Sequence, residues 1–218
     1  MKPPSGTSGD TAHLIARAVI TAMPGIGGTA LEMFNAIVVP PLERRRNEWM
    51  EHMAQAFEEL QKRVTRLEDL QNNEGFIDVV IKASRIAVSD NQKEKIDALK
   101  NAIINAGTTE SIDRALQQIF LGYIDTFSVW HFKILELLNN PPASFGIQSQ
   151  NEFAPVGSLD MVQRVIPELR GREQFFTFVW KDLYTKGLVN QEVIVVRPGS
   201  TYLTSYGSQF VAFINLPR

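Results

Sequence analysis

A glycine-rich stretch near the N-terminus has the spacing of a phosphate-binding loop. Gly25, Gly27 and Ala30 satisfy the pattern G-x-G-x-x-[GA]. Such a loop binds a dinucleotide when it joins a strand to a helix in repeated βαβ units, with an acidic residue about 20 positions further on. Here Glu43 and Glu48 fall in a polar helical stretch, and no series of parallel strands follows. We therefore interpret the glycines as a break in an apolar helical hairpin and expect no cofactor.

The remaining residue types offer little to catalysis or metal binding. The chain has no cysteine, and the spacing of His13, His52 and His131 is not that of a metal site. His131 lies on an apolar helical face, which favours a hydrogen-bonded structural role. Neither G-x-S-x-G nor S-x-x-K occurs. We expect no metal ion, no catalytic residues and a protein that is not an enzyme, with an enzyme of unrecognised site as an alternative.

Three consecutive arginines form the one dense positive patch of the sequence. Arg44, Arg45 and Arg46 stand near an expected helix start, where the helix dipole disfavours cations. Two interpretations stay open: the charges are neutralised by nearby acids in solvent, or the patch contacts an anionic lipid surface or nucleic-acid phosphates. Trp49 fits both interpretations, as a packed core ring or as an interfacial anchor.

Composition describes an ordinary globular protein. The 218 residues are 44% hydrophobic and 21% charged, and the formal net charge of -2 excludes a chain-wide basic field. The uncharged run 18–31 is about 14 residues, short of the roughly 20 that span a bilayer. With no signal peptide expected, we predict a cytoplasmic protein, in which this run and the arginine patch could give conditional contact with the inner membrane.

A long helix with one apolar face is expected after Pro40-Pro41, since proline is tolerated in a first helical turn. Its apolar residues recur at alternating spacings of three and four through Gln71, which is a heptad seam. Two partners are open for this seam: a helix of the same chain, or the same helix of a second copy in a homodimer. The seam residues are Met50, Met53, Phe57, Leu60, Val64 and Leu67.

Three further apolar stripes predict the rest of a helical bundle. The first runs from Gly75 to Ser89, the second ends at Gly107, and the third predicts one long buried helix over 110–139. We therefore expect a mainly α protein, with a disordered arm over 1–12 and a helical domain over 13–140 that contains the hairpin, the long helix and the bundle.

The C-terminal third has a different pattern. A linker is expected over 141–157, and a small α+β module over 158–218. The order of expected elements is that of a winged helix. They are a helix over 159–169, a turn at Gly171, a helix over 173–186, strands over 188–196 and 202–204, and a helix over 205–214.

The sequence of this module, from Leu183 to Val189 and from Leu203 to Phe210, resembles the C-terminal pattern L-x-x-x-G-L-[VI] … L-T-x-x-G-x-x-[FL] of many bacterial winged-helix proteins. In that pattern Gly187 ends the second helix, Thr204 caps the last helix and Gly207 admits close backbone packing. Together with the Pro-Pro-Leu-Glu-Arg-Arg-Arg helix, the chain is similar in layout to uncharacterised bacterial proteins of the abortive-infection "Abi-alpha" type. The resemblance implies a role in phage defence or stress, and no catalytic residues.

The expected second helix of the module is rich in aromatic residues, which favours protein contact over base reading. Seven basic and five acidic residues over 159–218 give only a mild positive charge. We therefore expect a non-enzymatic bacterial interaction protein that acts through protein or membrane contacts or self-association. The alternative is a winged-helix DNA-binding regulator, for which the candidate contacts are Arg172, Gln174, Lys181, Lys186 and Arg197.

Overall fold

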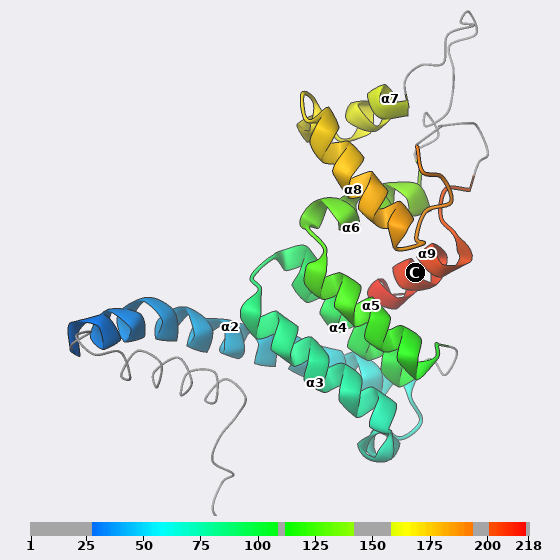
Figure 1. The fold of residues 1–218 in the computed structure, drawn as a ribbon. Coiled ribbons are helices and arrows are strands. Elements are labelled where there is room, and N and C mark those ends of the chain that lie inside the picture. The colour runs from blue at the N-terminus through cyan, green and yellow to red at the C-terminus, as the bar shows by residue number, and fades with distance from the viewer. Residues whose placement is uncertain (1–27, 109–111, 142–157, 194–200, 217–218) are drawn as a thin grey trace, which may run out of the picture.

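The structure is a computed structural model that describes residues 28–108, 112–141, 158–193 and 201–216. This part of the chain is mainly helical, as expected (Figure 1). None of its helices is both long and apolar enough to cross a membrane. The expected arm, Gly25, Gly27, most of the expected linker and Arg197 lie outside the described residues.

The long helix α2 (Gly28–Arg63) starts earlier than expected and contains Pro40 and Pro41 in its interior. The prediction of a helix start at these prolines is wrong. Each proline lacks the N–H that would bond the carbonyl four residues earlier, at Ala36 and Ile37. Both of these residues are exposed, on the half of α2 that projects away from the other helices in Figure 1. Water can therefore satisfy the two free carbonyls, and the helix continues.

The long helix also ends earlier than its apolar pattern, at Arg63 and not near Gln71. Lys62 and Arg63 stand in its last turn, where the helix dipole favours cations, and both pair with Glu59. The last seam residue, Leu67, belongs to the short 3-10 helix η1 (Leu67–Asn72). The spacing of the apolar residues did not predict that the helix ends at Arg63, because these residues keep the same period beyond that position.

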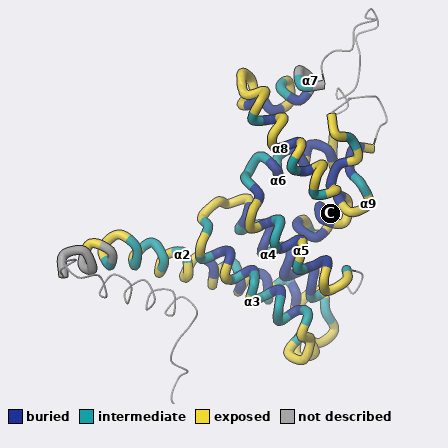
Figure 2. The backbone as a smooth tube through the Cα atoms, in the orientation of Figure 1, coloured by how far each residue is buried: buried dark blue, intermediate teal, exposed yellow. Residues whose placement is uncertain are grey.

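Two expected middle helices are confirmed, as α3 (Glu74–Ser89) and α4 (Lys93–Thr108). The side chain of Asn73 caps α3 by accepting the Phe76 N–H at 3.0 Å. Helix α4 packs against α2, α3, α5 and α9, and half of its residues are buried (Figure 2). It is the central helix of the bundle.

The expected single helix over 110–139 is two helices, α5 (Arg114–Thr126) and α6 (Val129–Asn139). Phe127 and Ser128 between them have extended backbone, and the Ser128 N–H donates to Nδ1 of His131, which caps the new helix. The apolar period runs through the break, so the pattern did not reveal it. The change of direction lets α5 pack on α3 and α4 while α6 packs on α8 and α9.

The C-terminal elements are α7 (Ser158–Val165), the 3-10 helix η2 (Pro167–Leu169), α8 (Glu173–Thr185) and α9 (Ser205–Ile214). One expected helix is thus split before Pro167, because the residue preceding a proline is pushed out of helical conformation. Gly171 makes the expected turn with φ of 71°. In place of the two expected strands, the described residues contain one antiparallel bridge, between Val189 and Leu203.

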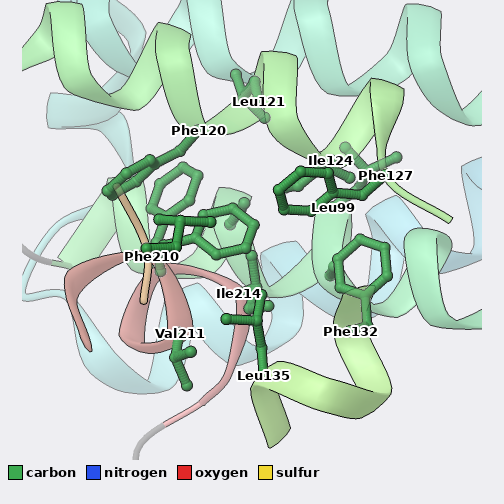
Figure 3. Packing of buried hydrophobic residues seen from close by; sticks show 14 of the residues in the cluster. Leu99, Phe120, Leu121, Ile124, Phe127, Phe132, Leu135, Phe210, Val211 and Ile214 are labelled. Atoms are coloured by element: carbon green, nitrogen blue, oxygen red, sulfur yellow. The ribbon is translucent and has the colours of Figure 1, made fainter. Parts of the chain in front are cut away.

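A single apolar core joins the early helices to the C-terminal ones. Its centre is a group of aromatic rings, with Phe120 from α5 in edge contact with Phe210 of α9 at 5.2 Å between ring centroids. Figure 3 shows these rings beside Phe127, Phe132 and the aliphatic side chains that fill the space around them. Helix α9 is therefore a core element of the bundle.

Candidate functional site

The most exposed aromatic side chain of the C-terminal region lies on α8, so the residues that position α8 come first. Gly187 ends the helix in the left-handed region, with φ of 72°. The Thr204 hydroxyl donates to the Gly187 carbonyl at 2.6 Å and accepts the Gly207 N–H at 2.9 Å, which caps α9. A Cβ on Gly207 would lie 2.0 Å from the Leu188 carbonyl oxygen. The roles expected of these glycines and of Thr204 are confirmed, and they lock the end of α8 against the start of α9.

A buried polar contact fixes α8 to α6. His131 is 4% exposed, its ring stacks on Phe127 at 4.4 Å, and its Nε2 lies 3.2 Å from Oδ2 of Asp182 on α8. The geometry is off the line of a good hydrogen bond, so the contact is mainly electrostatic. Lys186 binds the other oxygen of Asp182 at 2.7 Å. Burial lowers the pKa of His131, and the Asp182 carboxylate offsets this only in part.

Ser128, His131 and Asp182 are the residue types of a nucleophilic triad, and Ser128 Oγ lies 2.9 Å from His131 Nδ1. The same Nδ1 accepts the Ser128 backbone N–H at 3.1 Å, which occupies the lone pair that a general base needs. These residues line neither of the two cavities described for the molecule. The arrangement is therefore a helix cap, in keeping with the structural role expected of His131.

Aromatic rings and cations meet where α6 faces the start of α8. The rings of Trp130 and Phe175 are 6.1 Å apart, edge to face. The Arg172 guanidinium carbon lies 4.4 Å from the Phe175 ring centre and 5.2 Å from that of Trp130. Lys133 Nζ is 4.9 Å from the Trp130 ring centre and 3.6 Å from Glu168. Both cations are thus held against aromatic faces of their own chain.

The outer face of α8 is dominated by one ring. Phe178 is 67% exposed, with Gln174 one turn before it, Lys181 nearly one turn after it and Tyr184, 39% exposed, beyond. Sequence reasoning counted Phe178 with the other aromatics of this helix. The sequence could have predicted that Phe178 is exposed, because the buried residues of this helix follow a helical period that omits position 178. That stripe consists of Phe176, Val179, Trp180 and Leu183.

The candidate nucleic-acid contacts have different surroundings. Arg172 is stacked on rings, Lys186 is half-buried and paired with Asp182, and Arg197 lies outside the described residues. Gln174 and Lys181 remain exposed. Phe178 lies between these two on the helix, so no continuous positive face covers the described part of α8.

The arginine patch on α2 is divided by the fold. Trp49 is 3% exposed and donates its indole N–H to Ser84 Oγ at 3.0 Å, so the prediction that it serves as an interfacial anchor is wrong. Arg45 turns inward and donates to the Ser89 carbonyl at 3.1 Å. Arg44 lies 3.8 Å from Glu48 in an exposed pair, and Arg46 is exposed. The three cations therefore face different surroundings.

The heptad seam has partners within the chain. Met53 and Leu60 are buried, and Phe57, Val64 and Leu67 pack against the same core, where α2 meets α3 and α4. Met50, by contrast, is 60% exposed. The alternative of a partner helix in the same chain accounts for the buried members of the seam.

Other kinds of site were also compared. Among the described residues, no group of three or more histidine or acidic side chains converges as metal ligands would. Comparisons with protein-family models, with curated proteins and with solved structures found no match.

Proposed function

We propose that this chain is a non-enzymatic interaction protein that binds a protein partner through the outer face of α8. The observation that carries the proposal is Phe178, a large ring left 67% exposed in the middle of a helix whose opposite face is buried. Exposed aromatic side chains on rigid elements are typical energetic centres of protein interfaces, because a partner's pocket removes their full area from water without ordering a loop.

The surroundings of Phe178 support a protein partner over a nucleic acid. Base readout needs several Arg, Asn or Gln side chains on the groove-facing side of a helix. Here Gln174 and Lys181 are the nearest such residues, while Arg172 is engaged with Phe175 and Trp130. A ring flanked by one amide and one ammonium group has the mixed character of a protein interface.

A winged helix is the fold that we propose for the C-terminal module. Two features support it: the order α7, α8, then a chain reversal, and the antiparallel bridge between Val189 and Leu203 at the base of that reversal. This fold keeps a DNA-binding regulator as the second candidate function, because α8 would be its recognition helix and its outer face is uncovered.

The resemblance to Abi-alpha proteins gives the proposal a biological setting. We place the chain in bacterial phage defence or stress response, acting in the cytoplasm. The proposed partner is then a protein whose state changes during infection or stress, and binding through α8 is the signal that this chain transmits.

The test starts from a photo-reactive phenylalanine analogue in place of Phe178 in the full chain, to identify what contacts α8 in cells. The purified partner is then titrated against the wild type, Phe178→Ser and the control Ile81→Ser, which removes another exposed apolar side chain, on α3. We expect Phe178→Ser to weaken binding at least tenfold and Ile81→Ser to change it less than twofold.

Duplex DNA is the contrasting ligand in the same test. A DNA-binding protein loses affinity steeply as salt rises, because each neutralised phosphate releases counterions. We expect no submicromolar binding of duplex DNA near physiological salt. Salt-sensitive submicromolar binding that disappears in a combined Arg172→Glu and Lys181→Glu variant would establish the regulator in place of the interaction protein. Equal binding of the partner by wild type and Phe178→Ser would also refute the proposal.

A further inference from the structure

A cavity of about 280 Å³ opens between the middle of α2, the turn from α3 to α4 and the first turns of α4. Its lining residues come from α2, α3, α4 and the turn between α3 and α4, and none of them belongs to α8. Ligand pockets in proteins commonly begin near 300 Å³, so this cavity suits a ligand smaller than a drug-sized molecule. Its lining includes Arg45, His52 and Lys93 together with three carboxylates.

The α2 wall of the cavity has hydrogen-bonding capacity that the protein does not use. Arg45 is held in place by its Nη1 bond to the Ser89 carbonyl, while its Nε is shielded from solvent and has no hydrogen-bond partner among the described residues. Nδ1 of His52, two turns further along the same helix, is also shielded from solvent and has no hydrogen-bond partner among the described residues. Buried polar atoms in folded proteins are nearly always bonded, so two orphans lining one cavity need an explanation.

The charges around the cavity do not cancel once existing pairs are taken into account. Of the three carboxylates, Asp90 is bound by the buried Lys95 at 2.8 Å, and Glu48 lies 3.8 Å from Arg44. Asp97 forms no ion pair within the described part of the chain, and neither do the cations Arg45 and Lys93. The cavity lining therefore contains two cations and one carboxylate that form no ion pair with the described residues.

We propose that this cavity binds a small phosphate-bearing molecule, with the phosphate held between Arg45 and Lys93. A guanidinium group from α2 and an ammonium group from α4, both among the lining residues, match the charge of a phosphate monoester. Asp97 then accepts a hydrogen bond from a hydroxyl or amino group of the ligand. This site is separate from the α8 face and does not depend on the function proposed for that face.

The test is calorimetric titration of the full chain with glycerol 3-phosphate and with inorganic phosphate, in chloride buffer at constant ionic strength. We expect saturable binding at one site. Lys93→Gln should weaken it at least tenfold, and so should Arg45→Gln. Arg46→Gln is the matched control, because it removes the same charge from the neighbouring position on α2, outside the cavity lining. It should change binding less than twofold.

Arg45→Gln also removes the bond to Ser89, so a loss of folding in that variant leaves Lys93→Gln as the deciding one. The Lys93 side chain is exposed and makes no hydrogen bond or ion pair with the described residues. Absence of saturable binding would overturn the proposal. So would an equal loss in Arg46→Gln and Lys93→Gln, which marks general surface charge, or acetate binding as tightly as phosphate, which marks a carboxylate site.

Discussion

At the scale of single residues, the chemistry-bearing side chains of this protein serve mainly to hold helices together. His131 and Asp182 join α6 to α8, Lys186 binds Asp182 within the end of α8, and Thr204 joins the end of α8 to α9. Sequence alone placed Thr204 and the glycines around it correctly, because a turn pattern is local. It did not pair His131 with Asp182, because the two are 51 positions apart and neither pattern refers to the other.

The buried histidine makes stability depend on pH. Burial lowers the pKa of His131 in the folded state, whereas in the unfolded chain the pKa lies near the ordinary histidine value of 6.5. The neutral His131 ring therefore makes its full contribution to the free energy of unfolding above about pH 6.5. This contribution decreases as the pH falls below that value, by no more than about 1.4 kcal/mol per pH unit. We expect urea denaturation to show a smaller pH dependence between 7.5 and 5.5 for His131→Gln. Parallel curves for the two proteins would contradict this assignment.

Among the glycines that the structure describes, Gly207 has the least room for a side chain. An added Cβ would meet the Leu188 carbonyl oxygen at 2.0 Å, a contact with backbone that rotation of a side chain cannot relieve. We expect Gly207→Ala to lower the free energy of unfolding by about 1–3 kcal/mol, in the range of overpacked sites. Thermal or urea denaturation measures it.

Gly122 in α5 is the matched control, because its Cβ would have no heavy atom within 4 Å. Gly122→Ala should raise the free energy of unfolding by about 0.5–1 kcal/mol, since alanine is the better helix former. Two similar losses would mean that the approach of Gly207 to Leu188 is not the cause.

At the scale of elements, apolar periodicity identified helices but missed two of the positions at which they end. It predicted α3, α4, α8 and α9 nearly to the residue, because each has a polar or glycine stop. It carried one helix across the break at Phe127-Ser128 and another across Arg63, where the apolar period continues without interruption. Those stops depend on a capping histidine and on an ion pair, which no count of apolar spacing includes.

The end of α9 is capped by another helix. The Asn105 side-chain amide on α4 donates to the carbonyls of Ala212, Phe213 and Asn215, each at 2.9 Å. Asn105→Leu keeps a similar volume but leaves these carbonyls, including the buried one of Phe213, without their donor, so we expect a loss of about 1–3 kcal/mol in the free energy of unfolding. Asn101→Leu, at a half-buried position that donates to Ile214 alone, should cost less. Urea denaturation compares the two variants, and an equal or larger loss for Asn101→Leu would refute the capping role of Asn105.

At the scale of the whole molecule, one apolar core extends from Trp49 on α2 to Ile214 on α9. Sequence patterns indicated a helical region and a C-terminal module but not the interface between them, because α4 and α9 meet through residues more than 100 positions apart. The cavity beside Arg45 likewise arises only when several elements are assembled.

A shared core predicts cooperative unfolding. Two double variants each keep one tryptophan. The variant with Trp130→Phe and Trp180→Phe keeps Trp49, whose fluorescence reports on α2. The variant with Trp130→Phe and Trp49→Phe keeps Trp180, whose fluorescence reports on α8. We expect each fluorescence transition in urea to coincide with the loss of helical circular dichroism of the same variant. If instead the transition of Trp180 separates from the loss of helix, the C-terminal elements unfold as an independent unit.

The docking of α9 onto α4 also sets the order in which the molecule can be built. The bond from Asn105 to the Phe213 carbonyl closes a loop of 108 residues, whereas α3, α4 and α5 follow one another directly along the chain. Contacts of such long range form slowly, because chain entropy is lost before the contact is gained. We therefore expect helix α9 to dock late in folding, and until it docks the side of the Phe120 ring that Phe210 contacts is open to water and to other chains. Substitutions in α9 consequently act on the unfolding rate and leave the folding rate nearly unchanged.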